Sequence, residues 1–76
     1  MLGFEALQVR LVTQVRDKIR SGELTERRLA ILTGISQPHV HNVLKGKRVF
    51  SIRASDAVLA ELRMTVLDLL GPADYR

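Results

Sequence analysis

Two histidines and two side-chain amides lie close together in the middle of the chain and supply hydrogen-bonding groups. They are Gln37, His39, His41 and Asn42, in the segment SQPHVHNVLKGKR at residues 36–48. An Asn or Gln amide can form two hydrogen bonds to one base edge, and an imidazole can donate or accept one. The segment has no acidic residue, and its last four residues include three cations. This combination favours a surface that contacts a polyanion.

The same side chains do not fit a metal site or a catalytic centre. His39 and His41 are two positions apart, so on a helix they point to different faces. The chain has no Cys, and no nearby carboxylate completes a tetrahedral ligand set. No nucleophile is paired with a base, and a chain of 76 residues has little room for a deep pocket. We therefore predict no metal, no cofactor and no enzymatic activity.

Positive charge is concentrated around this segment. The formal net charge is +4, and no Asp or Glu occurs between residues 27 and 55. Residues 54–76, in contrast, contain four acidic and two basic residues. A localised basic surface favours a nucleic-acid partner, although a basic face that is only solvated would have the same composition. The cations of the acid-free stretch are Arg27, Arg28, Lys45, Lys47, Arg48 and Arg53.

Apolar periodicity and helix-ending residues predict five helices and no strand. Apolar side chains spaced three and four residues apart predict a first helix with one buried stripe, which excludes Val9. Ser and Thr residues are positioned to cap the later helices, and Gly residues to end them. The predicted helices span residues 4–20, 26–33, 37–45 and 52–63, with a short fifth helix between Thr65 and Gly71. The predicted stripe consists of Phe4, Leu7, Leu11, Val12, Val15 and Ile19.

These elements predict one small all-α domain that spans residues 1–76. A chain of this size buries only about 60% of its unfolded surface, which allows a single modest core. The sequence has no signal-like segment and no apolar run near about twenty residues. We expect a compact five-helix bundle with no membrane partner, located in the cytoplasm with the nucleoid. Its expected inner residues include Leu29, Ala30, Leu32, Ile35, Val40, Val43, Leu59 and Leu62.

The second and third predicted helices form a helix-turn-helix motif over about residues 25–45. Gly34 lies in the short turn, where a left-handed backbone has little steric cost for glycine. Val40 and Val43 lie three residues apart and form the inner stripe of the second motif helix. The polar side chains of that helix are therefore left on its outer face.

The stretch ERRLAILTGISQPHVHNVLKGKRVFSIRASDAVLAELRMTVLDLL, residues 26–70, resembles the Cro and phage-repressor family of helix-turn-helix domains, also called the xenobiotic-response-element family. The resemblance rests on LAxxTGIS, Gln37, the apolar Val40 and Val43, GKR, Ser51 and LxMTxLDLL. It implies a lambda-repressor-like bundle of about five helices that binds operator DNA as a dimer. The helix at residues 37–45 would then lie in the major groove.

The resemblance also implies roles for individual residues, which the side-chain chemistry supports in part. Pro38 can offer only apolar contact to a thymine methyl. Where the family usually has Gln, this chain has Glu26, whose carboxylate would face a phosphate unfavourably. Thr25, Arg27 or the amides of the helix start are then expected to supply that anchor. Base contacts are predicted for Gln37, Pro38, His39, His41 and Asn42, and phosphate contacts for Thr25, Arg27, Arg28, Lys45, Lys47 and Arg48.

The last predicted helix is apolar on more than one side, so its side chains cannot all enter one small core. One interpretation is a twofold dimer contact, and the other is that residues 71–76 fold back over the helix. A dimer would place two recognition helices about 34–36 Å apart, which matches successive major grooves. The predicted contact residues are Val66, Leu67, Leu69, Leu70 and Tyr75.

The prediction of function is sequence-specific binding to double-stranded operator DNA by a small transcriptional regulator, with repression as the expected mode. It would act by blocking or recruiting polymerase. An antitoxin or restriction-controller protein that regulates its own operon and binds a protein partner would carry the same module. A domain that keeps this fold and binds protein in place of DNA is a third possibility, because fold does not fix function.

Overall fold

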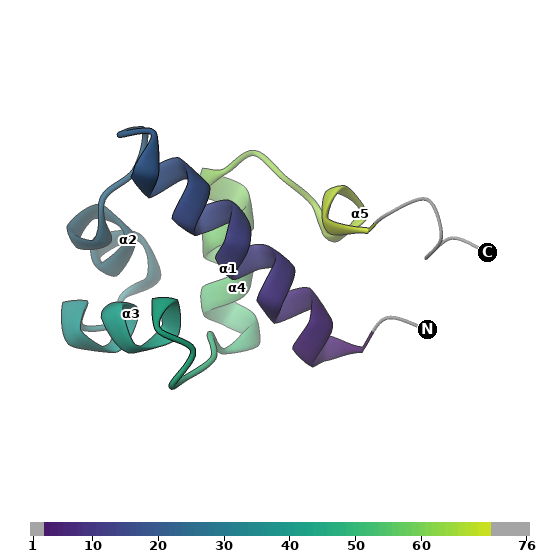
Figure 1. Cartoon of the computed structure of the whole chain (residues 1–76), viewed down its shortest axis with the longest axis horizontal. Helices are drawn as coiled ribbons and strands as arrows, with labels where there is room; N and C mark the ends of the chain where they lie inside the picture. Colours follow the sequence, from purple (N-terminus) through teal and green to yellow (C-terminus); the bar gives the residue numbers. More distant parts are fainter. Residues whose placement is uncertain (1–2, 71–76) are drawn as a thin grey trace.

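Five α-helices make up the structure, a computed structural model in which residues 3–70 are described (Figure 1). No strand occurs within that range, so the prediction of an all-α fold with five helices is confirmed for it. Among the same residues, no helix has the length and apolar character needed to cross a bilayer. The helices are α1 (Phe4–Arg20), α2 (Glu26–Thr33), α3 (Gln37–Leu44), α4 (Ile52–Glu61) and α5 (Val66–Leu69).

The long helix α1 runs across the molecule and packs along its inner stripe (Figure 1). Leu11 and Val15 are fully buried, whereas Val9 is exposed, as its position off the stripe predicts. The prediction for Phe4 is wrong, because 49% of this residue is exposed. Phe4 is the first residue of α1, and Figure 1 shows that this helix starts at the end of the molecule away from α2 and α3.

Local signals start and stop α2 and α3. The Thr25 hydroxyl oxygen accepts a hydrogen bond from the Arg28 amide, and the Ser36 hydroxyl oxygen accepts one from the His39 amide. Each bond satisfies an amide that has no partner within its own helix. Gly34 ends α2 in the left-handed conformation with φ of 73°. Only residues 34–36 separate the two helices, so α3 leaves α2 after a tight turn.

The core contains side chains from all five helices, and it also includes residues outside the helices. Val40 and Val43 point inward from α3, as their spacing predicts, and Leu29 does so from α2. Phe50 lies in the connection between α3 and α4 and is fully buried. The predicted loop therefore contributes a large side chain to the core.

The end of α4 and the position of α5 differ from the sequence prediction. Helix α4 stops at Glu61, two residues early, because Arg63 adopts a left-handed backbone with φ of 55°. The capping interaction of α5 is present, since the Thr65 amide donates to Asp68 Oδ2 at 2.7 Å. Leu69 is only 7% exposed and packs in the core, so the structure removes this side chain from the predicted dimer contact.

Candidate nucleic-acid interface

The outer side of α3 forms a shallow, open depression with the start of α2. Gln37 and Pro38 are exposed in its wall, and Asn42 is partly buried there. The side-chain amides of Gln37 and Asn42 make no hydrogen bond to any other residue within 3–70. Two amides are therefore available to an external partner on the outer side of α3. The depression is lined by Glu26, Gln37, Pro38, His41 and Asn42.

The two histidines have different surroundings. His41 is exposed, and its ring nitrogen Nδ1 lies 3.2 Å from Glu26 Oε1. This contact joins the first residue of α2 to the middle of α3. His39 is partly buried beside the depression and is not among the residues that line it. The Glu26 carboxylate, expected from the sequence to face a phosphate unfavourably, thus has an internal partner.

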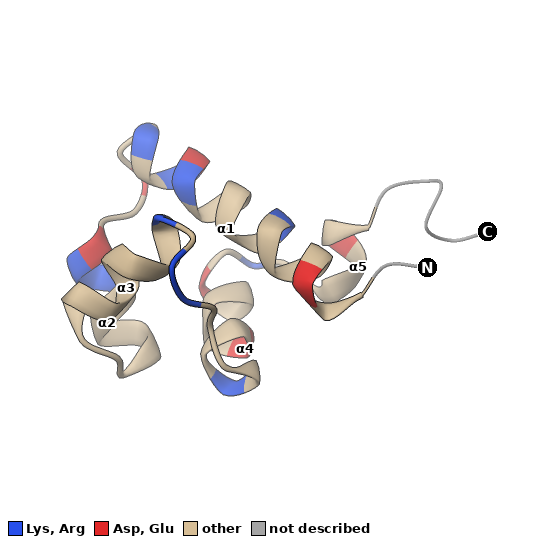
Figure 2. Cartoon of the chain, turned by 60° about the horizontal axis from the view of Figure 1, so that its bottom comes forward, with Lys and Arg blue, Asp and Glu red and all other residues tan. Residues whose placement is uncertain are grey.

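A basic segment follows α3 directly (Figure 2). The amide of Lys45, the residue after α3, donates back to the helix, and the Lys47 amide donates to the Asn42 carbonyl at 2.9 Å. Lys45, Lys47 and Arg48 are all exposed. Within residues 3–70 none of the three has an acidic partner, since every ion pair there involves other cations. The cations are thus held beside α3 and remain open to an anion.

The residues at the start of α2 that were predicted to contact phosphate are not equally available to a phosphate. Arg28 Nε lies 3.1 Å from Glu61 Oε1, so this guanidinium links α2 to the end of α4. Thr25 already accepts the capping hydrogen bond, which leaves its hydroxyl hydrogen for a further contact. Arg27 is exposed and forms no ion pair within the described part of the chain. Of the two arginines, Arg27 is therefore the one without an acidic partner among residues 3–70.

Gln8 on α1 fixes the end of the basic segment, and its role was not predicted. Its Nε2 donates to Ser55 Oγ at 2.8 Å, while its Oε1 accepts from the Phe50 amide at 3.1 Å. These bonds fasten the α3–α4 connection to α1 and α4 just after Arg48. Spacing offered a signal, because position 8 shares a helix face with the buried Leu11 and Val15.

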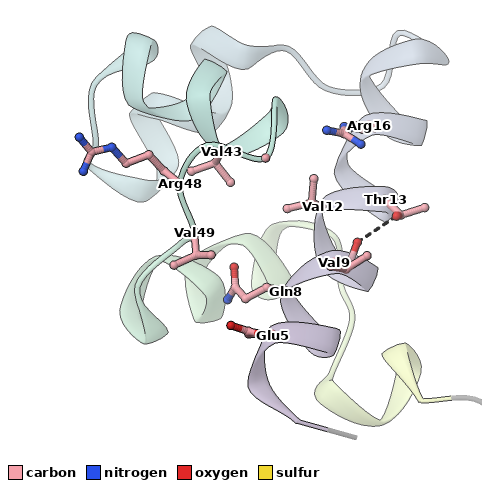
Figure 3. Close-up of a pocket in the computed structure, with 10 residues that line it drawn as sticks. Glu5, Gln8, Val9, Val12, Thr13, Arg16, Val43, Arg48 and Val49 are labelled. Atoms are coloured by element: carbon pink, nitrogen blue, oxygen red, sulfur yellow. Dashed lines mark hydrogen bonds between the residues drawn. The ribbon is translucent and has the colours of Figure 1, made fainter.

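A second hollow lies between α1 and this connection (Figure 3). Gln8 lies at its base, and the exposed Val9 and Val49 line its sides. Arg16 is at its rim, whereas Arg48 extends away from it. The hollow is mostly apolar and holds none of the polar side chains of α3.

The two concave surfaces contain no set of ligands for a metal ion. Across residues 3–70, no group of three or more His, Cys, Asp or Glu side chains is arranged to bind one. Comparisons with protein-family models, curated proteins and solved structures give no match. Function is therefore inferred from the site itself.

Proposed function

We propose that the protein binds double-stranded DNA sequence-specifically and acts as a small transcriptional repressor. In this proposal α2, the turn at residues 34–36 and α3 form the helix-turn-helix motif of a lambda-repressor-like domain, and α3 enters the major groove. The observation that carries the proposal is the outer face of α3. It combines amides that have no hydrogen-bond partner within residues 3–70 with a segment of exposed cations that have no acidic partner in that range.

The dimensions and chemistry of α3 suit the major groove. An α-helix with its side chains is about 10–12 Å wide, and the groove is about 12 Å wide. Gln37 lies in the first turn of α3, where helix-turn-helix proteins contact base edges. Its amide and that of Asn42 can each pair with adenine through two hydrogen bonds, worth roughly 1–3 kcal/mol of discrimination. Pro38, also exposed, adds apolar surface for a thymine methyl.

Phosphate contacts in this proposal come from both sides of α3. Lys45, Lys47 and Arg48 follow the helix, and Arg27 precedes it on α2. Cations that neutralise phosphates release counterions, which supplies affinity without sequence preference. Arg28 contributes less, because its guanidinium is bound to Glu61.

The proposal includes binding as a homodimer through the exposed side of α5. Val66 and Leu67 are 45% and 62% exposed. Leu70 is partly buried, and Tyr75 lies outside the described residues. Figure 1 places α5 at the opposite end of the molecule from α2 and α3, so contact there leaves both copies of α3 exposed.

A second candidate function is binding to a protein in place of DNA, as in an interaction module that keeps this fold. The apolar hollow between α1 and the α3–α4 connection favours it, because Val9 and Val49 remain 66% and 58% exposed there. Binding to DNA at low salt separates the two candidates. A module that has lost its nucleic-acid contacts would leave duplexes unbound in about 20 mM salt, where phosphate attraction is strongest.

Selection of bound duplexes from a random pool tests the proposal. The wild-type protein should enrich one motif, and the double variant Gln37→Ala, Asn42→Ala should lose that enrichment while it keeps general affinity for DNA. Gln14→Ala is the matched control, because it removes an amide from α1 and leaves α3 intact. A wild-type pool without any enriched motif would refute sequence-specific binding.

A further inference from the structure

The contact between Glu26 and His41 determines which ring nitrogen carries a proton. An ionised carboxylate has no hydrogen to donate and can only accept. His41 Nδ1 lies 3.2 Å from Glu26 Oε1, so the hydrogen bond requires Nδ1 to be the donor. A neutral imidazole has one proton for two nitrogens. With Nδ1 protonated, Nε2 is left with a lone pair and becomes a hydrogen-bond acceptor.

The acceptor is available to a partner in the depression of α3. The His41 side chain is 52% exposed, whereas that of Glu26 is 33% exposed. No second hydrogen bond to the His41 ring occurs within residues 3–70. The ring lines the same depression as Gln37 and Asn42. Nε2 therefore belongs to the surface that carries the side-chain amides of Gln37 and Asn42.

We infer that His41 is a specificity-determining residue and that Glu26 sets its preference by fixing the tautomer. The inference rests on the proposed binding of α3 in the major groove. An acceptor at Nε2 selects a base with an amino donor, which is N4 of cytosine or N6 of adenine. Guanine presents only the acceptors N7 and O6, and thymine presents O4. Either would face Nε2 with a second acceptor and leave both groups without a hydrogen bond.

Glu26→Gln tests this inference with almost no change of shape. A Gln amide can accept from Nδ1–H or donate to an unprotonated Nδ1, so the tautomer is no longer fixed. We expect the preference for cytosine or adenine at one position of the selected motif to fall about 3- to 10-fold, as for the loss of one hydrogen bond. His41→Ala should abolish the preference at the same position. Positions read by Gln37 should remain unchanged in both variants.

The duplex selection includes a control for the lost negative charge, and NMR of the free protein tests the tautomer of His41 without DNA. Glu61→Gln removes one acid at the α4 end and should leave the motif unchanged. Nitrogen-15 NMR of the free protein should show His41 protonated at Nδ1, with His39 as the internal comparison. Both measurements use about pH 8.5, because a doubly protonated ring would donate from both nitrogens.

The outcomes separate this inference from the proposed function. A ring protonated at Nε2 in the wild-type protein would overturn the role of Glu26. An enriched motif that is identical for wild type, Glu26→Gln and His41→Ala would overturn the role of His41 while leaving DNA binding intact. Absence of any enriched motif would refute the proposed function, and the inferred base preference with it.

Discussion

Replacing one of the cations beside α3 should change DNA affinity differently from replacing the amides of Gln37 and Asn42. Lys47→Ala should weaken binding to all duplexes alike, because a phosphate contact carries no sequence information. The slope of log affinity against log salt should decrease by about 0.9 for the lost contact. Affinity measured by fluorescence anisotropy across a salt series gives this slope.

Arg63→Asn is the control for the loss of one positive charge. Arg63 lies on the connection between α4 and α5, outside α3 and the basic segment that follows it. Asn tolerates the left-handed backbone at this position. An equal change of slope in both variants would mean that Lys47 acts only through net charge.

Replacing Phe50 tests how much one core side chain contributes to stability. Phe50→Ala should lower the free energy of unfolding by about 3–5 kcal/mol, because removing a fully buried ring leaves a cavity that the surrounding side chains fill only in part. Val49→Ala, next to it and 58% exposed, should change it by less than about 0.5 kcal/mol. Urea denaturation followed by far-ultraviolet circular dichroism compares the two. Equal midpoints would contradict the burial of Phe50.

At the scale of the elements, the α3–α4 connection is held in position by hydrogen bonds that involve α1 and α4. Gln8→Leu keeps the side-chain size but leaves the buried Phe50 amide without an acceptor. We expect a loss of about 1–3 kcal/mol in unfolding free energy and faster amide exchange at residues 47–50. General affinity for DNA should fall while base discrimination by α3 is retained.

Ser55→Ala provides the comparison for Gln8→Leu. It removes the acceptor of the Gln8 Nε2 bond and leaves the bond from the Phe50 amide in place. Exchange at residues 47–50 should then stay near the wild-type rate. Hydrogen-exchange mass spectrometry measures this rate in both variants. Equally faster exchange in both would show that the hydrogen bond from the Phe50 amide to Gln8 does not hold residues 47–50 in place.

The helices were predictable from the sequence because their signals are local. Capping by Thr25 and Ser36 involves residues only three positions apart, and the predicted and observed bounds of α1 and α2 agree. The pairs that shape the site join residues 15–47 positions apart, as in His41 with Glu26 and Gln8 with Ser55. No periodicity encodes such pairs, since they exist only once the helices pack. The ion pair of Arg28 was not predicted for this reason, because the sequence does not show that Glu61 lies beside it.

For the whole molecule, the proposed dimer explains why α5 keeps apolar side chains at its surface. Leu69 is used to anchor α5 in the core, and the Arg10 guanidinium donates to its carbonyl at 2.8 Å. That anchor orients Val66 and Leu67 outward. One copy of α3 reaches only a few base pairs, so two copies spaced about 34–36 Å apart would double the sequence that is read.

Leu67→Lys should separate the copies, because burying an unpaired ammonium at an apolar contact is strongly unfavourable. Sedimentation should show a monomer where the wild type shows a dimer, and binding to a two-half-site duplex should become non-cooperative. Ile31→Lys is the control, since this α2 side chain is 73% exposed and adds the same charge outside the proposed contact. A variant that sediments as the wild type does would exclude this face of α5 from the dimer. If Leu67→Lys still binds a single half-site as tightly as the wild type, the loss of cooperative binding is due to the lost dimer contact, and the α3 surface is intact.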